Sequence, residues 1–153
     1  MPLKNIPFVL SPELLYILSA AGHGDEIVLA DAHFPSSSIC KHGPKEIRAD
    51  GHTIPTLLEA ILKLFPLDMY VDAPVAVMEV VPSDKAKGMT TPSVWNQYEA
   101  IVNAAEEKPV SFEKVERFAF YERAKNAFAV VHTGETAQYG NIIIKKGVVL
   151  PQD

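Results

Sequence analysis

The chain has 153 residues, 48% of them apolar and 22% charged, and this length favours one compact domain with its own core rather than two. Nineteen acidic against fourteen basic residues give a formal net charge of −5, too little positive charge to hold a nucleic-acid backbone. A single cysteine cannot close an intrachain disulfide, and no run of eighteen apolar residues predicts a membrane span. We therefore expect one cytoplasmic domain over residues 1–153, with neither a nucleic acid nor a membrane as partner.

Four helices are predicted from apolar residues that recur at intervals of three and four. The first begins at Ser11, whose hydroxyl can accept a free helix N–H, and ends at Gly22. The second runs from Thr53 to Phe65 and stops before a proline. The third covers Pro92 to Glu107, and a shorter fourth covers Ala119 to Asn126.

Six strands alternate with these helices. Several are nearly continuous β-branched runs, which is typical of strands covered on both faces. The alternation predicts an α/β fold, with a mixed and mostly covered sheet flanked by helices. The polar stretch Ser83 to Thr91 is expected to be a surface loop, and Thr133 to Asn141 a hairpin-like connection. The strands are expected at Glu26 to Ala30, Glu46 to Arg48, Pro74 to Val81, Lys114 to Arg117, Phe128 to His132 and Asn141 to Val149.

The first candidate for chemistry is His23, which lies between two glycines that let the backbone turn and leave the imidazole accessible. It is either an acid/base group or a histidine that caps the end of the first helix, and the local residues favour neither. Asp31 follows the first strand, where open α/β sheets bind ligands. This carboxylate either orients an imidazole or binds sugar hydroxyls, or it caps the next turn.

The second candidate is a group of aromatic and basic residues from Arg117 to Lys125. Rings beside a guanidinium can line a carbohydrate site, although the local sequence alone favours an ordinary amphipathic helix. Downstream, Tyr139 and Asn141 lie on a turn from which both can project into a pocket. The histidines and Cys40 reproduce no metal-ligand spacing, and no nucleotide-binding or serine-nucleophile motif is present. The remaining His, Asp, Tyr and Arg suit proton transfer without a metal or cofactor.

Six segments, in the same order along nearly the whole chain, closely resemble the RbsD/FucU family. Any one of them would be modest evidence, whereas six in the correct order are highly specific. They are LSPELL at Leu10 to Leu15, GHGDEIVLADAHFP at Gly22 to Pro35, IRADG at Ile47 to Gly51, PLD at Pro66 to Asp68, RFAFYERAKNAFAVV at Arg117 to Val131, and TGE with YGNIIIKKGV between Thr133 and Val148.

The resemblance implies an isomerase. Members of this family interconvert the α and β anomers of L-fucose, related members interconvert the pyranose and furanose forms of ribose, and none uses a metal or cofactor. It also implies an RbsD-like α/β domain that forms homo-oligomers, from dimers to decameric rings. The alternatives left open are a ribose pyranase, a monosaccharide-binding protein without catalysis, and a metal-dependent hydrolase or isomerase.

The resemblance also assigns roles to residues. His23 matches the family's proton donor, and Asp68 and Tyr121 match positions implicated in catalysis. Asp31 matches the sugar-binding aspartate, so we expect it to hold sugar hydroxyls and to raise the basicity of His23. We expect His23 to protonate the ring oxygen of the sugar, while Asp68 or Tyr121 handles the anomeric hydroxyl. Tyr121 is also a substrate-binding position, together with Met78, Arg117, Tyr139 and Asn141.

Overall fold

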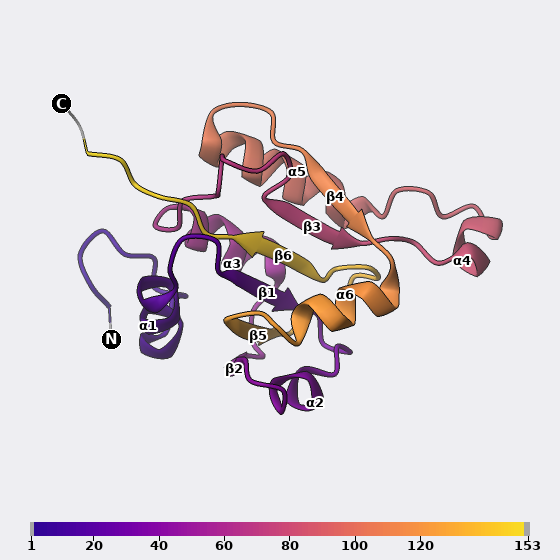
Figure 1. Cartoon of the computed structure of the whole chain (residues 1–153), viewed down its shortest axis with the longest axis horizontal. Helices are drawn as coiled ribbons and strands as arrows, with labels where there is room; N and C mark the ends of the chain where they lie inside the picture. The colour runs from indigo at the N-terminus through magenta and orange to yellow at the C-terminus, as the bar shows by residue number, and fades with distance from the viewer. Residues whose placement is uncertain (1, 152–153) are drawn as a thin grey trace.

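A six-stranded mixed sheet in the order β2-β5-β1-β6-β3-β4 forms the centre of the computed structural model, which describes residues 2–151 (Figure 1). β1 runs parallel to β5 and antiparallel to β6, and β3 runs antiparallel to β6 and parallel to β4. The predicted α/β class with a mixed sheet is therefore confirmed. The strands are β1 Glu26–Ala30, β2 Lys45–Ala49, β3 Val75–Met78, β4 Phe112–Val115, β5 Ala129–Thr133 and β6 Ile142–Lys145.

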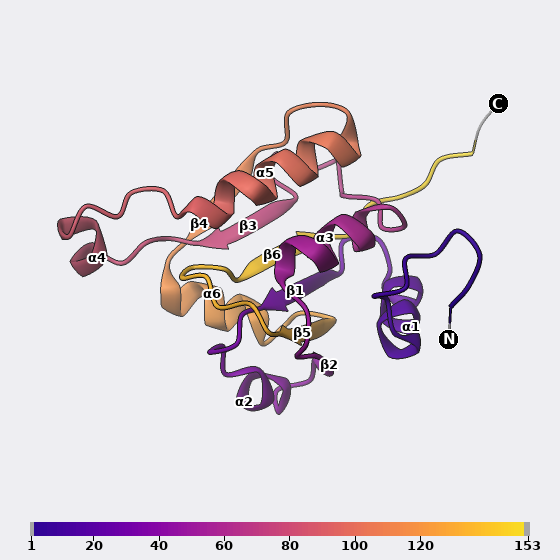
Figure 2. The same ribbon diagram turned by 180° about the vertical axis from the view of Figure 1, so that it is seen from behind.

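Helices cover both faces of this sheet. α3 and α5 lie on the face seen in Figure 2, and α6 lies on the face seen in Figure 1. β1 shows the consequence, because Ile27 and Leu29 pack into the core on one face while Val28 and Ala30 pack into the core on the other. The helices are α1 Pro12–Ala20, α2 Ser36–Cys40, α3 Ile54–Leu62, α4 Pro82–Ala86, α5 Ser93–Glu106 and α6 Arg117–Ala124, and none in residues 2–151 is long and apolar enough to cross a membrane.

The boundary between β4 and α6 differs from the prediction by two residues. Glu116 caps α6, because its carboxylate accepts the N–H of Ala119 at 2.9 Å. The strand therefore ends at Val115, and Arg117 is the first residue of the helix rather than the last of the strand. This places Arg117 and Tyr121 one helical turn apart on the same face of α6.

The connection from Thr133 to Asn141 is not a hairpin. β1 lies between β5 and β6 and pairs with both of them, so this segment crosses over the end of β1. Two short helices were also not predicted, namely α2 and α4, and α4 overlaps the start of the expected Ser83 to Thr91 loop. Five residues form little more than one turn, too few to show a helical period.

Ion pairs attach α6 to the sheet. The guanidinium of Arg123 donates to Glu26 at the start of β1, with Nε 3.0 Å from Oε1, and to Glu113 of β4, with Nη1 2.8 Å from Oε2. These ion pairs fix the end of α6 opposite to Arg117, which sets where the first turn of the helix lies.

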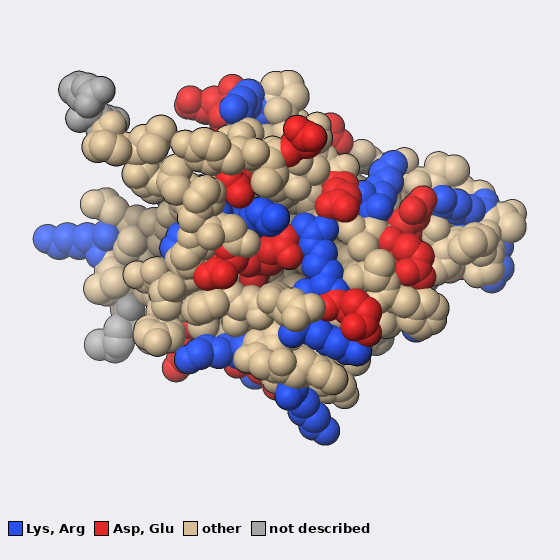
Figure 3. Space-filling model, in the orientation of Figure 1, with Lys and Arg blue, Asp and Glu red and all other residues tan. Residues whose placement is uncertain are grey.

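On this face of the molecule acidic and basic side chains are interspersed rather than gathered into one basic patch (Figure 3).

Candidate functional site

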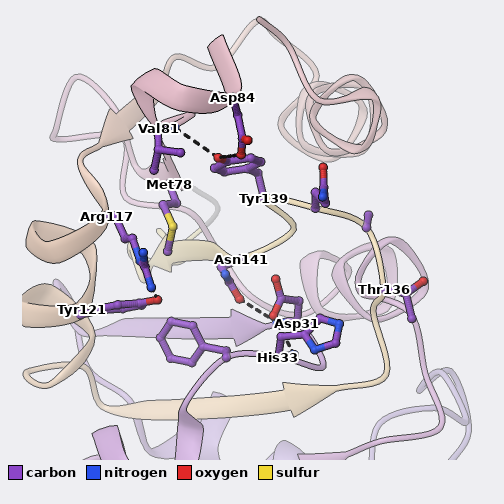
Figure 4. Close-up of a pocket in the computed structure, with 13 residues that line it drawn as sticks. Asp31, His33, Met78, Val81, Asp84, Arg117, Tyr121, Thr136, Tyr139 and Asn141 are labelled. Atoms are coloured by element: carbon purple, nitrogen blue, oxygen red, sulfur yellow. Dashed lines mark hydrogen bonds between the residues drawn. The ribbon is translucent and has the colours of Figure 1, made fainter. Parts of the chain in front are cut away.

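A pocket of about 620 Å³ lies at one edge of the sheet (Figure 4). The parallel strands β1 and β3 end at this edge with Ala30 and Met78, and the antiparallel strand β6 begins there just after Asn141. Chain segments from distant parts of the sequence therefore meet at this point, as expected for an open α/β sheet. Six of the eight predicted site residues line the pocket, namely Asp31, Met78, Arg117, Tyr121, Tyr139 and Asn141.

The floor of the pocket is built around Asp31. Its backbone N–H donates to Oδ1 of Asn141 at 2.7 Å, and its own Oδ1 accepts the backbone N–H of His33 at 3.0 Å. Burial raises the pKa of the Asp31 carboxyl above its ordinary value, and it outweighs the hydrogen bonds and the nearby histidine charges that act in the opposite direction. The folded protein therefore holds Asp31 in its ionised form at a cost in stability. The amide nitrogen of Asn141 is left to bind a ligand, because the hydrogen bond to Asp31 uses the amide oxygen.

Arg117 and Tyr121 form the α6 side of the pocket. Nε–H of Arg117 donates to the Tyr121 hydroxyl oxygen at 3.2 Å, and the guanidinium carbon lies 5.6 Å from the centre of the Tyr121 ring. This hydrogen bond raises the pKa of Arg117, which stays charged. Because the phenol oxygen accepts from Arg117, its own hydrogen remains available to an oxygen atom of a ligand. Phe34 supports the Tyr121 ring edge to face, with the ring centres 5.6 Å apart.

Tyr139 lies across the pocket, with its hydroxyl already engaged. The hydroxyl donates to Oδ2 of Asp84 at 2.5 Å and accepts the backbone N–H of Val81 at 3.2 Å. Burial is the main cause that raises the pKa of Tyr139, and the hydrogen bond to Asp84 raises it further. Its backbone has a left-handed φ of 58°, and Trp95 of α5 donates from Nε1 to its carbonyl oxygen at 2.9 Å. The structure therefore presents the ring of Tyr139, rather than its hydroxyl, to a ligand.

His23 and Asp68 lie elsewhere, at the amino end of β1. Nε2 of His23 lies 3.1 Å from Oδ1 of Asp68, and the His23 side chain is 47% exposed whereas Asp68 is buried. A strand of five residues is about 17 Å long, so Asp31 at its other end does not contact this imidazole within the same chain. The carboxylate that acts on His23 is Asp68, and the expectation that Asp31 raises its basicity does not hold within one subunit.

The turn around His23 is held without help from the imidazole. Gly22 N–H donates to Oδ2 of Asp25 at 2.7 Å, and Gly24 has a φ of 88°, a conformation that favours glycine. The ammonium group of Lys146 donates to the carbonyl oxygens of Leu18 and Ala21, both at 2.6 Å. Lys146, and not His23, therefore caps the carboxyl end of α1, which excludes the helix-cap interpretation of His23.

The surroundings of Asp68 favour the ionised form of its carboxyl group. Its burial opposes ionisation, but the hydrogen bonds from His23 and from the backbone N–H of Tyr70, with the charges of His23 and Lys145, together hold the pKa of Asp68 below its ordinary value. An ionised Asp68 fixes the orientation of the imidazole and leaves Nδ1 of His23 free to exchange a proton. A histidine paired with a carboxylate in this way can act as an acid or a base.

Seven pocket residues were not identified as site residues from the sequence, namely His33, Phe34, Val81, Asp84, Thr136, Ala137 and Gln138. His33 and Phe34 follow Asp31 directly, and the rule that ligands bind beyond the ends of strands could have included them. Val81 and Asp84 lie on a segment whose return to the pocket no sequence pattern signals. Within residues 2–151 no three His, Cys, Asp or Glu side chains gather as a metal site.

The fold and the pocket define a small α/β protein with a ligand pocket in which carboxylate, amide and guanidinium groups converge beside aromatic rings, a lining that suits a polyhydroxylated ligand. The model of the RbsD / FucU transport protein family matches residues 4–149. The chain therefore belongs to the RbsD/FucU family, as the sequence segments predicted.

Named relatives match almost the whole chain. A protein from Homo sapiens named fucose mutarotase is 65% identical over 147 residues, which are 96% of this chain and 94% of that protein. The crystal structure of the fucose mutarotase from Streptococcus pneumoniae in complex with L-fucose is 47% identical, with a TM-score of 0.85 over 97% of this chain and 100% of that one. The structure of Bacillus subtilis RbsD with D-ribose is more distant, at 25% identity and a TM-score of 0.66 over 98% and 100% of the two chains.

Proposed function

We propose that this protein is an L-fucose mutarotase, an isomerase that interconverts the α and β anomers of L-fucose. The observation that carries the proposal is the convergence of Asp31, Arg117, Tyr121 and Asn141 on one pocket. The much higher identity to proteins named fucose mutarotase than to the ribose-binding RbsD supports fucose over ribose as substrate. Met78 and Phe34 give the pocket the apolar edge that the C6 methyl group of fucose requires.

Different side chains of the pocket bind different parts of the sugar. The Asp31 carboxylate and the Asn141 amide bind sugar hydroxyls from the floor of the pocket, and Arg117 binds them from α6. The Tyr139 ring packs against a C–H face of the sugar, because its hydroxyl is held by Asp84 and Val81. The hydrogen of the Tyr121 hydroxyl is donated to the anomeric oxygen, where it stabilises the charge that develops as the ring opens.

We infer that the active protein is a homo-oligomer in which His23 of one copy reaches the pocket of another. Within one chain the imidazole is at the wrong edge of the sheet, and it projects from the surface beside exposed Tyr70 and Met69. At the pocket edge Phe118 is also 65% exposed, next to Arg117. Both edges thus carry apolar surface suited to contact between copies.

The free thiol of Cys40 suits a cytoplasmic location.

Mutarotation then needs two proton movements. Nδ1 of a protonated His23, oriented by Asp68, gives its proton to the ring oxygen O5 as the C1–O5 bond breaks. The anomeric hydroxyl gives its proton to a base in the pocket as C1 and O1 become an aldehyde. After rotation about C1–C2 the same steps run backwards on the other face of C1, so the enzyme ends in its starting state. Each positioned proton transfer contributes on the order of 10² to 10⁴ in rate.

The function is tested by saturation-transfer NMR on the anomeric protons of L-fucose and D-ribose, with and without the protein. Faster exchange of L-fucose anomers, with a smaller effect on ribose, is expected. Binding of L-fucose with no change in exchange would instead indicate a sugar-binding protein. Faster pyranose to furanose conversion of ribose would indicate the pyranase alternative.

Replacing Asp31 with asparagine is expected to separate stability from binding. The raised pKa of Asp31 means that its ionisation opposes folding at neutral pH, so Asp31→Asn should raise the melting temperature. The gain is present above the pKa of the folded state, falls as the carboxyl becomes protonated, and is gone below the unfolded value near 3.9. Sugar affinity should fall at least roughly tenfold, because a charged acceptor is lost.

Calorimetric melting curves between pH 4 and pH 8 and titration with L-fucose measure both effects. Glu122→Gln is the matched control, since Glu122 is an exposed carboxylate on α6 that contacts Lys125. A melting temperature that falls at neutral pH in Asp31→Asn would contradict the argument.

A further inference from the structure

The imidazole of His33 projects into the pocket beside Asp31 (Figure 4). His33 follows β1 by three residues, and its backbone N–H, not its ring, makes the hydrogen bond to Asp31 that shapes the turn. The side chain is exposed and makes no hydrogen bond to another described side chain among residues 2–151. Of the described residues that line the pocket it is the one histidine. The pocket thus contains a proton-exchanging group that the scheme above does not use.

The other polar groups around His33 are already engaged or have a binding role. Asp31 uses Oδ1 to accept the backbone N–H of His33 and offers its other oxygen to sugar hydroxyls, and Asp84 accepts the Tyr139 hydroxyl. The Tyr121 oxygen accepts from Arg117, which leaves the phenol as a hydrogen donor, and Arg117 itself stays charged. An imidazole exchanges protons near neutral pH in both directions, as a freely reversible reaction requires.

We propose that His33 is a catalytic residue of the same pocket, the base that takes the proton from the anomeric hydroxyl. This rests on the proposed mutarotase function. The neutral ring nitrogen removes the proton from O1, the electrons of the O1–H bond form the C1=O1 double bond, and those of the C1–O5 bond move to O5. O5 takes the proton of the acid, His23 of a second copy. In reclosure His33 returns its proton to O1, so protons and electrons balance over the cycle.

The proposal gives the pocket one histidine from each of two copies, an acid at O5 and a base at O1. It also assigns different tasks to Tyr121 and His33, since the phenol donates a hydrogen bond to O1 while the imidazole removes the O1 proton. The pocket would then need no carboxylate as base, which leaves Asp31 to bind hydroxyls.

The test replaces His33 with glutamine, which keeps the backbone N–H that holds Asp31. At saturating L-fucose the exchange rate per site is expected to fall by about 10² to 10⁴-fold, with a dissociation constant for L-fucose within about threefold of wild type. His42→Gln is the matched control, because His42 is an exposed histidine in the turn after α2 and does not line the pocket. It should exchange at the wild-type rate. His33→Asn repeats the test with a shorter side chain.

The pH dependence separates a base from a structural role. In the wild type the exchange rate should fall on the acid side when the base is protonated and on the alkaline side when the acid is deprotonated. The residual activity of His33→Gln should lack the acid-side fall and keep the alkaline one. A rate within about threefold of wild type in both variants, or a loss explained by weaker binding alone, would overturn the role of His33. A wild-type protein that does not accelerate exchange would instead overturn the proposed function itself.

Discussion

Replacing His23 with glutamine is expected to lower the catalysed exchange of L-fucose anomers by about 10² to 10⁴-fold. Glutamine preserves much of the side-chain size and a hydrogen-bond donor for Asp68, but it cannot carry a proton to the ring oxygen. The sugar-binding groups belong to the pocket at the other edge of the sheet and stay intact. The dissociation constant for L-fucose should therefore change by less than about threefold, so the loss appears in turnover and not in binding.

Saturation-transfer NMR measures the exchange rate, and isothermal titration calorimetry measures the affinity. Asp68→Asn is the informative companion variant, because Asp68 acts through His23. It should slow exchange less than His23→Gln does, since the amide can still orient the imidazole although it carries no charge. The proposed acid would be refuted by wild-type exchange in His23→Gln.

The regular elements with clear apolar patterns could be predicted from the sequence. β1 occupies the predicted residues because four consecutive buried apolar residues follow Glu26, and α3 carries an unbroken stripe of Ile and Leu. The start of α6 was misplaced because its cap is a glutamate, a weaker N-cap signal than serine or asparagine. The strand order could not be predicted, since nothing local shows that β1 separates β5 from β6.

The site was predicted as a set of residues but not as an arrangement. Asp31, Asn141 and Tyr139 come together because a parallel strand ends and an antiparallel strand begins at one edge of the sheet. The separation of His23 from Asp31 could nevertheless have been predicted from the sequence, because a strand of five residues between them places the two side chains at opposite edges of the sheet. The family resemblance assigns His23 and Asp31 to one function, but it carries no information about the distance between them.

That distance leads to the second large effect, a recovery of activity from two inactive proteins. Tyr121→Phe removes the hydrogen-bond donor to the anomeric oxygen and His23→Gln removes the acid, and each variant alone should be nearly inactive. If each site combines the pocket of one copy with His23 of another, a mixed oligomer contains some sites with an intact pocket and an intact histidine. Random assembly of equal amounts gives about a quarter of the wild-type activity per site, since each of the two contributions is intact with a probability of about one half.

The two variants are unfolded together in denaturant, mixed, refolded, and assayed by NMR exchange, with each variant refolded alone as the control. A mixture of His23→Gln with Asp68→Asn is the contrasting case, because both residues lie at the same edge of one chain and their combination yields no site with an intact pair. Wild-type activity of Tyr121→Phe would remove the donor role, whereas no recovery in correctly assembled mixed oligomers would show that His23 does not act across the contact between copies. Recovery in the first mixture and not in the second would place the imidazole of one subunit at the sugar bound by another, which makes assembly a requirement of the chemistry.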